Sequence, residues 1–443
     1  MLATPEENLN VCPDCFSASG LKRRIQEERP SFPNGVFCDF HPTKKGIPIK
    51  AVAAIVDPVF RENFVGGPYD AYYERYVETS GADLEDTLLE LTGADDTRVI
   101  DGMITELIDA DNYWPPDGEE AFYDTDYRYS REQTGLGEHN QLWSAFKTSL
   151  MHQRRFFNAE AEELLRRIFE DVHQQRDMNS SGPVYMIFPG GQGANFVRAR
   201  VANEPAKREE IKADLAGKLG PPPERMRKPG RLNPSGVSAF YGAYDADTCI
   251  AELRPSVGEL VAIAEFRITE PICVLDTTLF GSKPKAYDPF ATKARKRAAQ
   301  WLFMTGFMNE IARPILPDDV HLDYVPTQAV AEYLSNREFE FARRKRTIDA
   351  IVYRSAQHPG GRNIALLGPA SVVGPIVEPA YEPPPPGDSV LWSGWLSPEP
   401  PPRTRIVPIP ESFRVHRVDG VTFSAPAPES GNDEEGDGTN LRQ

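Results

Sequence analysis

One stretch, residues 230–268, sets the strongest limit on what this chain can fold into. After a turn rich in Asn, Pro, Ser and Gly, an apolar and aromatic strand is expected over 237–244. A helix should then start at Asp245 or Asp247, since aspartate is a good N-cap and apolar residues follow at helical spacing. A second Pro/Gly turn leads into a buried strand over 260–266. The pattern predicts strand, short helix and strand in that order.

Within this frame, Tyr241 falls at the end of the first strand, and Glu252 and Arg254 fall at the end of the helix. Two charges and a phenol on short elements bounded by glycines suit a ligand cleft, because the side chains are held rigidly and the backbone can approach a ligand. A surface ion pair beside a core tyrosine is the simpler interpretation, and residue types alone favour it. Evidence from other parts of the chain has to decide.

The phrases RLNPSG, FYGAYDADTCIAELRP and VAIAEFRI closely resemble the signature of the RES domain family. Members of that family are NAD-consuming enzymes and include toxins of toxin–antitoxin pairs. Further matching blocks occur in the family's order, at 195–201, 324–328, 348–355 and 360–363. The resemblance implies an α+β fold similar to that of ADP-ribosyltransferases, with helices around a small twisted mixed sheet.

The resemblance also implies roles for individual residues. Glu252 would be the carboxylate beside the ribose of NAD⁺, and Tyr241 would stack against the nicotinamide or ribose. Ser355 would hydrogen-bond the nicotinamide amide or the nearby ribose. Arg198 would hold the pyrophosphate, because the guanidinium fork can donate two hydrogen bonds and keeps its charge. Arg200, one strand alternation further on, competes with Arg198 for that role.

Three more residues are assigned to NAD⁺ binding. Arg231 and Arg254 are candidate anion contacts, and Asn363 lies in the GGxN loop that the family shares. The implied reaction is cleavage of the nicotinamide–ribose bond, with water as acceptor in a glycohydrolase or inorganic phosphate in a phosphorylase. Two alternatives stay open: an ADP-ribosyltransferase that uses the same pocket, and a non-catalytic NAD-binding or interaction module.

The N-terminal part carries a CxxC pair, Cys12 and Cys15, followed by Cys38 and His41. Three thiolates and one imidazole form a complete tetrahedral set for a structural Zn²⁺. Unrelated turns or a redox CxxC are the alternatives. The arrangement resembles the zinc-knuckle domain found ahead of some RES domains, although His41 stands where cysteine is more usual.

The composition limits the classes of partner that this chain can bind. A net charge of −17 and a pI near 5.0 argue against nucleic-acid binding through bulk electrostatics. No apolar run approaches a membrane span, and the N-terminus lacks a signal-peptide pattern, so a cytoplasmic location is expected. The expected partners are NAD⁺, inorganic phosphate, and an antitoxin or regulatory protein.

Three regions are expected. Residues 1–182 form a helical zinc-knuckle domain with a regulatory or partner-binding role, and 183–375 form the catalytic domain. The Pro-rich extension 376–443 should dock partly at 404–423 and be disordered from about 424. A helical stripe runs through 140–176, and the polar, Pro-rich stretch 203–229 is interpreted as a mobile connection.

Overall fold

The computed structural model describes residues 9–68, 81–111, 120–132, 135, 137–313, 320–374 and 404–421. It groups the chain into two compact units that interleave in sequence. Unit 1 comprises Met1–Met186, Lys228–Ser235 and Cys273–Arg354, and unit 2 comprises Ile187–Arg227, Gly236–Ile272 and Ser355–Gln443. The domain limits expected near residues 182 and 375 stay predictions. The disorder expected from about residue 424 concerns residues outside the described part.

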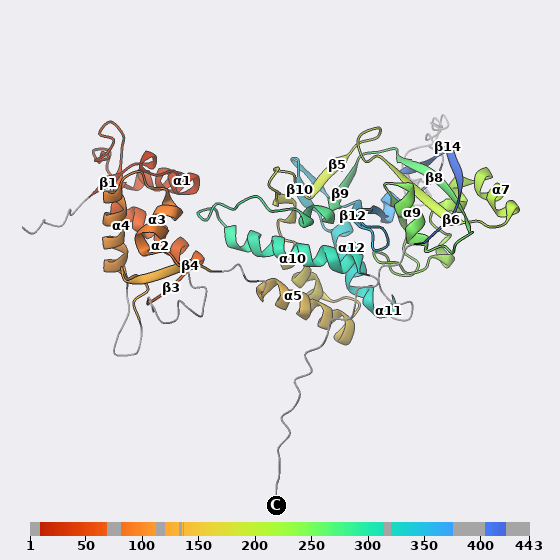
Figure 1. Ribbon diagram of the computed structural model, residues 1–443, viewed down its shortest axis with the longest axis horizontal. Coiled ribbons are helices and arrows are strands. Elements are labelled where there is room, and N and C mark those ends of the chain that lie inside the picture. Colours follow the sequence, from red (N-terminus) through yellow and green to blue (C-terminus); the bar gives the residue numbers. More distant parts are fainter. Residues whose placement is uncertain are drawn as a thin grey trace, which may run out of the picture. The chain divides into compact units, whose positions relative to one another are not determined.

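The N-terminal half of unit 1 is mainly helical, as expected (Figure 1). Its elements are β1 (Asn10–Val11), α1 (Ser19–Glu28), β2 (Ile47–Pro48), α2 (Ile49–Asn63), β3 (Phe64–Pro68), α3 (Leu84–Thr92), α4 (Thr97–Ala110) and β4 (Tyr127–Arg131). Two aspartates start helices: Asp83 accepts a hydrogen bond from the amide of Asp86, and Asp96 accepts one from the amide of Arg98. The apolar stripes of α2, α3 and α4 bury one shared core, which includes Val56.

The second part of unit 1 continues with further helices and short strands. They are α5 (Gly137–Thr148), α6 (Ala159–Phe169), β5 (Val184–Ile187), β9 (Ile272–Asp276), α10 (Ala294–Ala312), α11 (Val320–Asp323), α12 (Val325–Asn336), β10 (Phe339–Phe341), β11 (Arg344–Arg346) and β12 (Ala350–Arg354). The helical stripe expected over 140–176 is divided between α5 and α6. A π-helical turn at Ser149–Gln153 and the positive φ of 50° at Phe157 separate the two helices.

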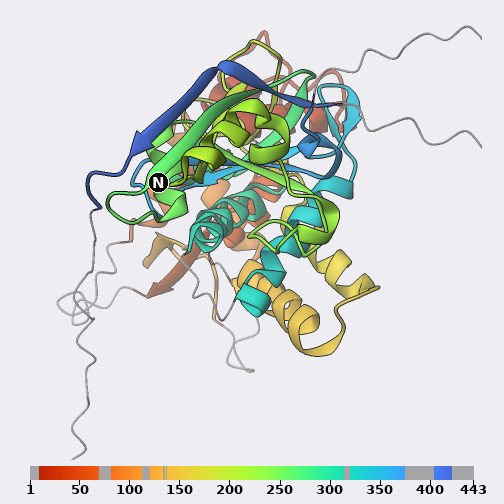
Figure 2. The same ribbon diagram turned by 90° about the vertical axis from the view of Figure 1, so that its right-hand side faces the viewer.

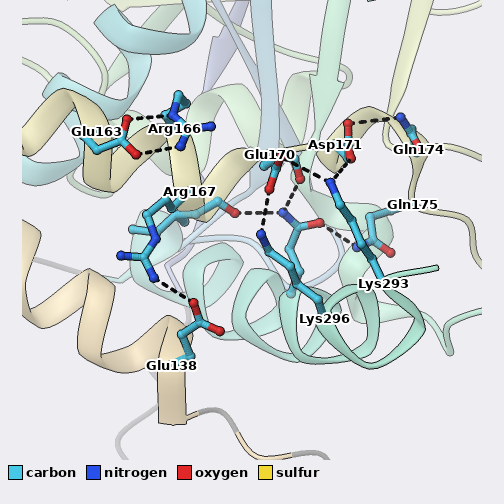
Figure 3. Close-up of polar contacts among 12 residues, drawn as sticks. Glu138, Glu163, Arg166, Arg167, Glu170, Asp171, Gln174, Gln175, Lys293 and Lys296 are labelled. Carbon is cyan, nitrogen blue, oxygen red and sulfur yellow. Dashed lines mark hydrogen bonds and ion pairs between the residues drawn. The ribbon is translucent and has the colours of Figure 1, made fainter. Parts of the chain in front are cut away.

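Charged and amide side chains join the end of α6 to α10 (Figure 3). The ammonium groups of Lys293 and Lys296 both pair with Glu170, at 3.3 and 2.6 Å. The buried amide of Gln300 donates to the carbonyls of Ile168 and Glu170, at 2.8 Å each. Because Gln300 is only 3% exposed, its two bonds satisfy groups that would otherwise be costly to bury. The network fixes how α6 and α10 pack within unit 1.

Unit 2 contains an antiparallel run of strands in the order β14, β8, β6, β7 and β13. Its elements are β6 (Asn195–Val201), α7 (Pro205–Ala213), α8 (Leu215–Leu219), β7 (Ala239–Ala243), α9 (Ala246–Leu253), β8 (Leu260–Ile268), β13 (Arg362–Leu367) and β14 (Ile406–Arg417). The stretch 203–229, interpreted from the sequence as a mobile connection, contains two helices, α7 and α8. Their start signals are Pro205 in the first turn of α7 and Asp214 capping α8.

The edge strand β14 comes from the C-terminal extension (Figure 2). It pairs with β8 from Ile406 opposite Ile268 to Arg417 opposite Leu260, with a register shift between Ile409 and Arg414. Segment 404–423, which is expected to dock, therefore contains a strand that extends the sheet of unit 2.

Unit 1 supplies the parallel component of the β structure, because β12 pairs with β9 in parallel, Ala350 opposite Val274. Parallel and antiparallel pairs together confirm the expected α+β architecture with mixed sheet structure and surrounding helices. The specific likeness to ADP-ribosyltransferases stays a prediction. Within the described residues, no helix has both the length and the apolar character that crossing a membrane requires.

Candidate active site

The helix α9 positions the central residue of the site. Asp245 caps it: one carboxylate oxygen accepts from the amide of Thr248 at 2.7 Å and the other from the Thr248 hydroxyl at 2.8 Å. Cys249 lies in an apolar cluster with Ala199, Ala243 and other strand residues, which holds the helix on the sheet. The predicted order of strand, short helix and strand is confirmed as β7, α9 and β8, with Asp245 as the N-cap.

Glu252, near the C-terminal end of α9, receives two hydrogen bonds on one carboxylate oxygen. The hydroxyl of Ser355 donates to Oε1 at 2.6 Å, and the amide of Asn363 donates to the same atom at 2.8 Å. Oε2 has no hydrogen-bond partner within the described residues. The structure thus brings together three of the predicted site residues and leaves one carboxylate oxygen available to a ligand.

The loop between β12 and β13 is folded around the Ser355 hydroxyl. Its oxygen accepts from the backbone amides of Gln357 and His358, at 3.1 and 3.0 Å, while it donates to Glu252. The Ser355 amide donates to the carbonyl of Gly361 at 2.9 Å, which closes the loop. A Cβ at Gly361 would collide with the Thr248 hydroxyl, so glycine is required for this close approach to α9.

The side chains of Tyr241 and Asn363 project from the same face of the sheet. Asn363 pairs with Ala243, and Ala365 pairs with Tyr241, in the antiparallel register of β13 and β7. Because residues two apart in a strand share a face and paired residues lie on the same side, Tyr241, Ala243 and Asn363 all lie on the side that α9 covers. The Tyr241 ring is therefore on the side of the sheet that carries Glu252.

Arg198 bridges β6 and β7. These strands pair at Val197 and Ala243, and beyond that pair Nη1 of Arg198 donates to the carbonyl of Tyr241 at 2.6 Å. The guanidinium lies 4.7 Å from the centroid of the Phe240 ring. Strand alternation puts Arg198 and its competitor Arg200 on the opposite face from Val197. The described contacts thus tie Arg198 to the backbone of Tyr241.

The two other arginines occupy different places. Arg254 is the C-cap of α9 in the left-handed conformation, with φ 49° and ψ 52°, a position that usually holds glycine. Arg231 belongs to unit 1, where its Nη1 donates to the carbonyls of Ile311 and Arg313 at the end of α10, at 3.0 and 2.5 Å. Arg254 follows Glu252 by two residues at the end of α9; the role of both arginines in anion binding stays a prediction.

The sequence patterns did not single out Thr248 and His358. Nδ1 of His358 lies 2.9 Å from the hydroxyl of Thr248, and the His358 amide contacts Ser355, so the histidine joins α9 to the loop. The sequence position of His358, between Ser355 and Asn363, could have indicated its proximity to the site, because any residue of so short a loop must lie close to both.

We expect Ser355→Ala to lower the free energy of unfolding by about 1–3 kcal/mol, because two backbone amides and the Glu252 carboxylate would each lose a partner. Chemical denaturation measures this. Ser256→Ala, the same change at an exposed position of unit 2, is the control and should change stability by less than about 0.5 kcal/mol. Equal effects of the two variants would show that the loop does not depend on this hydroxyl.

A separate cluster in unit 1 consists of Cys12, Cys15, Cys38 and His41. Their ligand atoms all lie within 4.8 Å of one another, with Sγ of Cys15 3.4 Å from Sγ of Cys38 and 3.5 Å from Nδ1 of His41. Tetrahedral Zn²⁺ with Zn–S distances of about 2.3 Å places its sulfurs about 3.8 Å apart, close to the spacing seen here. The four side chains can therefore hold a metal ion.

Burial raises the pKa of both Cys12 and Cys15 above the ordinary thiol value. Neutral thiols so close together gain little from their proximity, whereas a cation would stabilise them as thiolates. The same cause, burial, raises the pKa of Cys249 and of Cys273 to about 12. The latter two thiols lie outside the cluster and are buried in the hydrophobic core.

Residues 199–384 match the family model of the RES domain. Glu252, Ser355 and Asn363 all lie within the match, and Arg198 lies one residue before it. No curated protein and no solved structure matches the chain.

Proposed function

We propose that this chain cleaves the bond between nicotinamide and ribose in NAD⁺, because residues 199–384 match the family model of the RES domain. The observation that carries the proposal is the Glu252 carboxylate, held through Oε1 by Ser355 and Asn363. A fixed negative charge beside the sheet face that carries Tyr241 is what this reaction requires.

The physical reason lies in the transition state. Nicotinamide departs from a cationic pyridinium, so its departure leaves positive charge on the ribosyl ring. A preorganised carboxylate stabilises that charge, and its second oxygen can accept a hydrogen bond from a ribose hydroxyl. Since Ser355 and Asn363 orient Glu252 before substrate arrives, little reorganisation is needed during the reaction.

The other site residues would bind the remaining parts of NAD⁺. Tyr241 would stack on the nicotinamide or ribose, and Arg254 would contact the pyrophosphate. Arg198, which strand alternation places on the other face of the sheet, would support Tyr241 through the hydrogen bond to its carbonyl. Arg231 has a structural role in this proposal, because its guanidinium already holds the end of α10. An enzyme of this kind would deplete NAD⁺ in the manner of a toxin, and an antitoxin or regulatory partner would restrain it.

The test is incubation of the full-length protein with NAD⁺, with and without inorganic phosphate, with products identified by mass. We expect release of free nicotinamide. ADP-ribose as coproduct would identify water as acceptor, and ADP-ribose 1″-phosphate would identify phosphate. ADP-ribose attached to the protein or to an added macromolecule would support transferase activity instead. Binding of NAD⁺ without any nicotinamide release would contradict the proposal and favour a binding module.

The cysteine and histidine cluster has a structural role in this proposal. Cys12, Cys15, Cys38 and His41 would hold Zn²⁺ with no open coordination position, so the ion would stabilise the surrounding fold and take no part in chemistry. This expectation rests on the donor set and on the distances between the four ligand atoms.

A further inference from the structure

We infer that His358 is the general base of the site and that the acceptor it activates is water. This inference rests on the proposed function and extends it to the choice of acceptor. It depends on a chain of hydrogen bonds from Asp245 through Thr248 to His358, which determines which imidazole nitrogen carries the proton.

The direction of these hydrogen bonds follows from the number of protons that each group can donate. Thr248 has a single hydroxyl proton, and its geometry directs that proton to Oδ2 of Asp245, at 2.8 Å, because a carboxylate can only accept. The same hydroxyl oxygen lies 2.9 Å from Nδ1 of His358. With its proton already donated, the hydroxyl must accept there, so Nδ1 of His358 carries a proton. In the neutral imidazole, Nε2 is therefore the nitrogen with a lone pair.

The position of His358 is fixed on both sides. Its backbone amide donates to the Ser355 hydroxyl at 3.0 Å, and that hydroxyl donates to Glu252 at 2.6 Å. The backbone of His358 and the Glu252 carboxylate thus share Ser355 as a partner, while the imidazole contacts Thr248, which lies one helical turn before Glu252 on α9. Thr248 is fully buried, whereas His358 is only half-buried, and Nε2 has no hydrogen-bond partner among the described residues. The imidazole is consequently held about one helical turn from Glu252, on a residue that is only half-buried.

A base distinguishes the two candidate acceptors. Water must lose a proton as it forms a bond to carbon, whereas the phosphate dianion already carries an anionic oxygen and requires no base. In the step we infer, the water oxygen bonds to the ribosyl carbon and its proton moves to Nε2 of His358. The carbon–nitrogen bond breaks, and its electron pair leaves with nicotinamide, which becomes neutral. His358 then returns the proton to solvent.

The critical variant is His358→Asn. The asparagine amide can take the place of Nδ1 and still donate to Thr248, but it provides no basic nitrogen. We expect His358→Asn to lower kcat for nicotinamide release by about 10²–10⁴-fold, and His358→Ala should have the same effect. His416→Asn, the same change at an exposed position of β14, is the control and should leave the rate unchanged.

The pH profile separates a base from a structural residue. A base accepts a proton only in its unprotonated form, so the wild-type rate should fall on the acidic side, and this limb should be absent in His358→Asn. The charged groups joined to the loop are Asp245 and Glu252 on α9 and Arg362 next to Gly361, and none of them changes in this variant.

Each outcome of these experiments leads to a different conclusion. Absence of nicotinamide release by the wild type would overturn the proposed function itself. Release with ADP-ribose 1″-phosphate as the main product would leave the proposed function standing and overturn the assignment of water. Near wild-type activity and an unchanged pH profile in His358→Asn would reduce His358 to a residue that only holds the loop. ADP-ribose as product, with both activity and the acidic limb lost in the variant, is the result we expect.

Discussion

Glu252→Gln is expected to reduce kcat for nicotinamide release by about 10²–10³-fold, the usual effect of removing one preorganised electrostatic group. Glutamine has nearly the same shape as glutamate, and its carbonyl oxygen can still accept hydrogen bonds from Ser355 and Asn363. The variant should therefore fold normally and lose mainly the negative charge. Initial rates at saturating NAD⁺, together with the melting temperature, measure the two effects separately.

The matched control is Glu265→Gln, which makes the same chemical change at an exposed position of β8 in unit 2. It should retain the wild-type rate. If Glu252→Gln retained that rate as well, the carboxylate would not be stabilising charge in the transition state. The Ser355 and Asn363 contacts would then be ordinary packing between α9 and the loop.

The parts of the fold that local sequence predicts are those governed by local forces. Asp245 was recognisable as a helix start because an N-cap depends on residues within one turn, and the strand pattern of 260–266 appears in β8. The proximity of Cys12, Cys15, Cys38 and His41 was predictable for a related reason. Paired knuckles need short, fixed spacings within each pair, and such spacings can be recognised directly in the order of the residues.

Long-range arrangement was not predictable in the same way. The pairing of β14 with β8 joins residues about 140 positions apart, as in Ile406 opposite Ile268, and nothing in either strand specifies the other. The interleaving of the two units has the same origin, because it depends on which segments pack together rather than on their own propensities. The break at Phe157 is local, but its positive φ overrides an apolar stripe that continues on both sides.

The candidate site shows the same division. The family resemblance selected Glu252, Ser355 and Asn363, which the structure brings together. It did not select His358, whose role depends on a hydrogen bond to Thr248 from a residue 110 positions away. The role of Arg231 in anion binding is untested; its guanidinium donates to two carbonyl groups within unit 1, contacts that join residues about 80 positions apart and that local sequence does not specify.

Removal of the Zn²⁺ proposed for the Cys12, Cys15, Cys38 and His41 cluster should have the largest effect on the N-terminal core. Three of the four ligands, Cys12, Cys15 and Cys38, are buried in one cluster with Phe16 and other apolar residues of the N-terminal part of unit 1. Structural Zn²⁺ sites have apparent binding free energies of about 10–16 kcal/mol near neutral pH, and much of that energy is folding energy. We therefore expect Cys38→Ser, or a strong chelator, to unfold this core. Metal analysis and amide hydrogen exchange over residues 9–68 measure the change.

Cys273→Ser is the appropriate control, because it makes the same substitution at a buried thiol of β9 outside the cluster. This variant should keep one Zn²⁺ per chain and the exchange protection of residues 9–68, whereas Cys38→Ser should lose both. A purified wild-type chain without zinc, whose N-terminal amides stayed protected in chelator, would show that packing alone maintains this core. The four side chains would then be close together for reasons other than metal binding. Protection that depends on zinc would instead make the ion a part of the fold, because the neutral thiols, with pKa values raised by burial in Cys12 and Cys15, offer little attraction of their own.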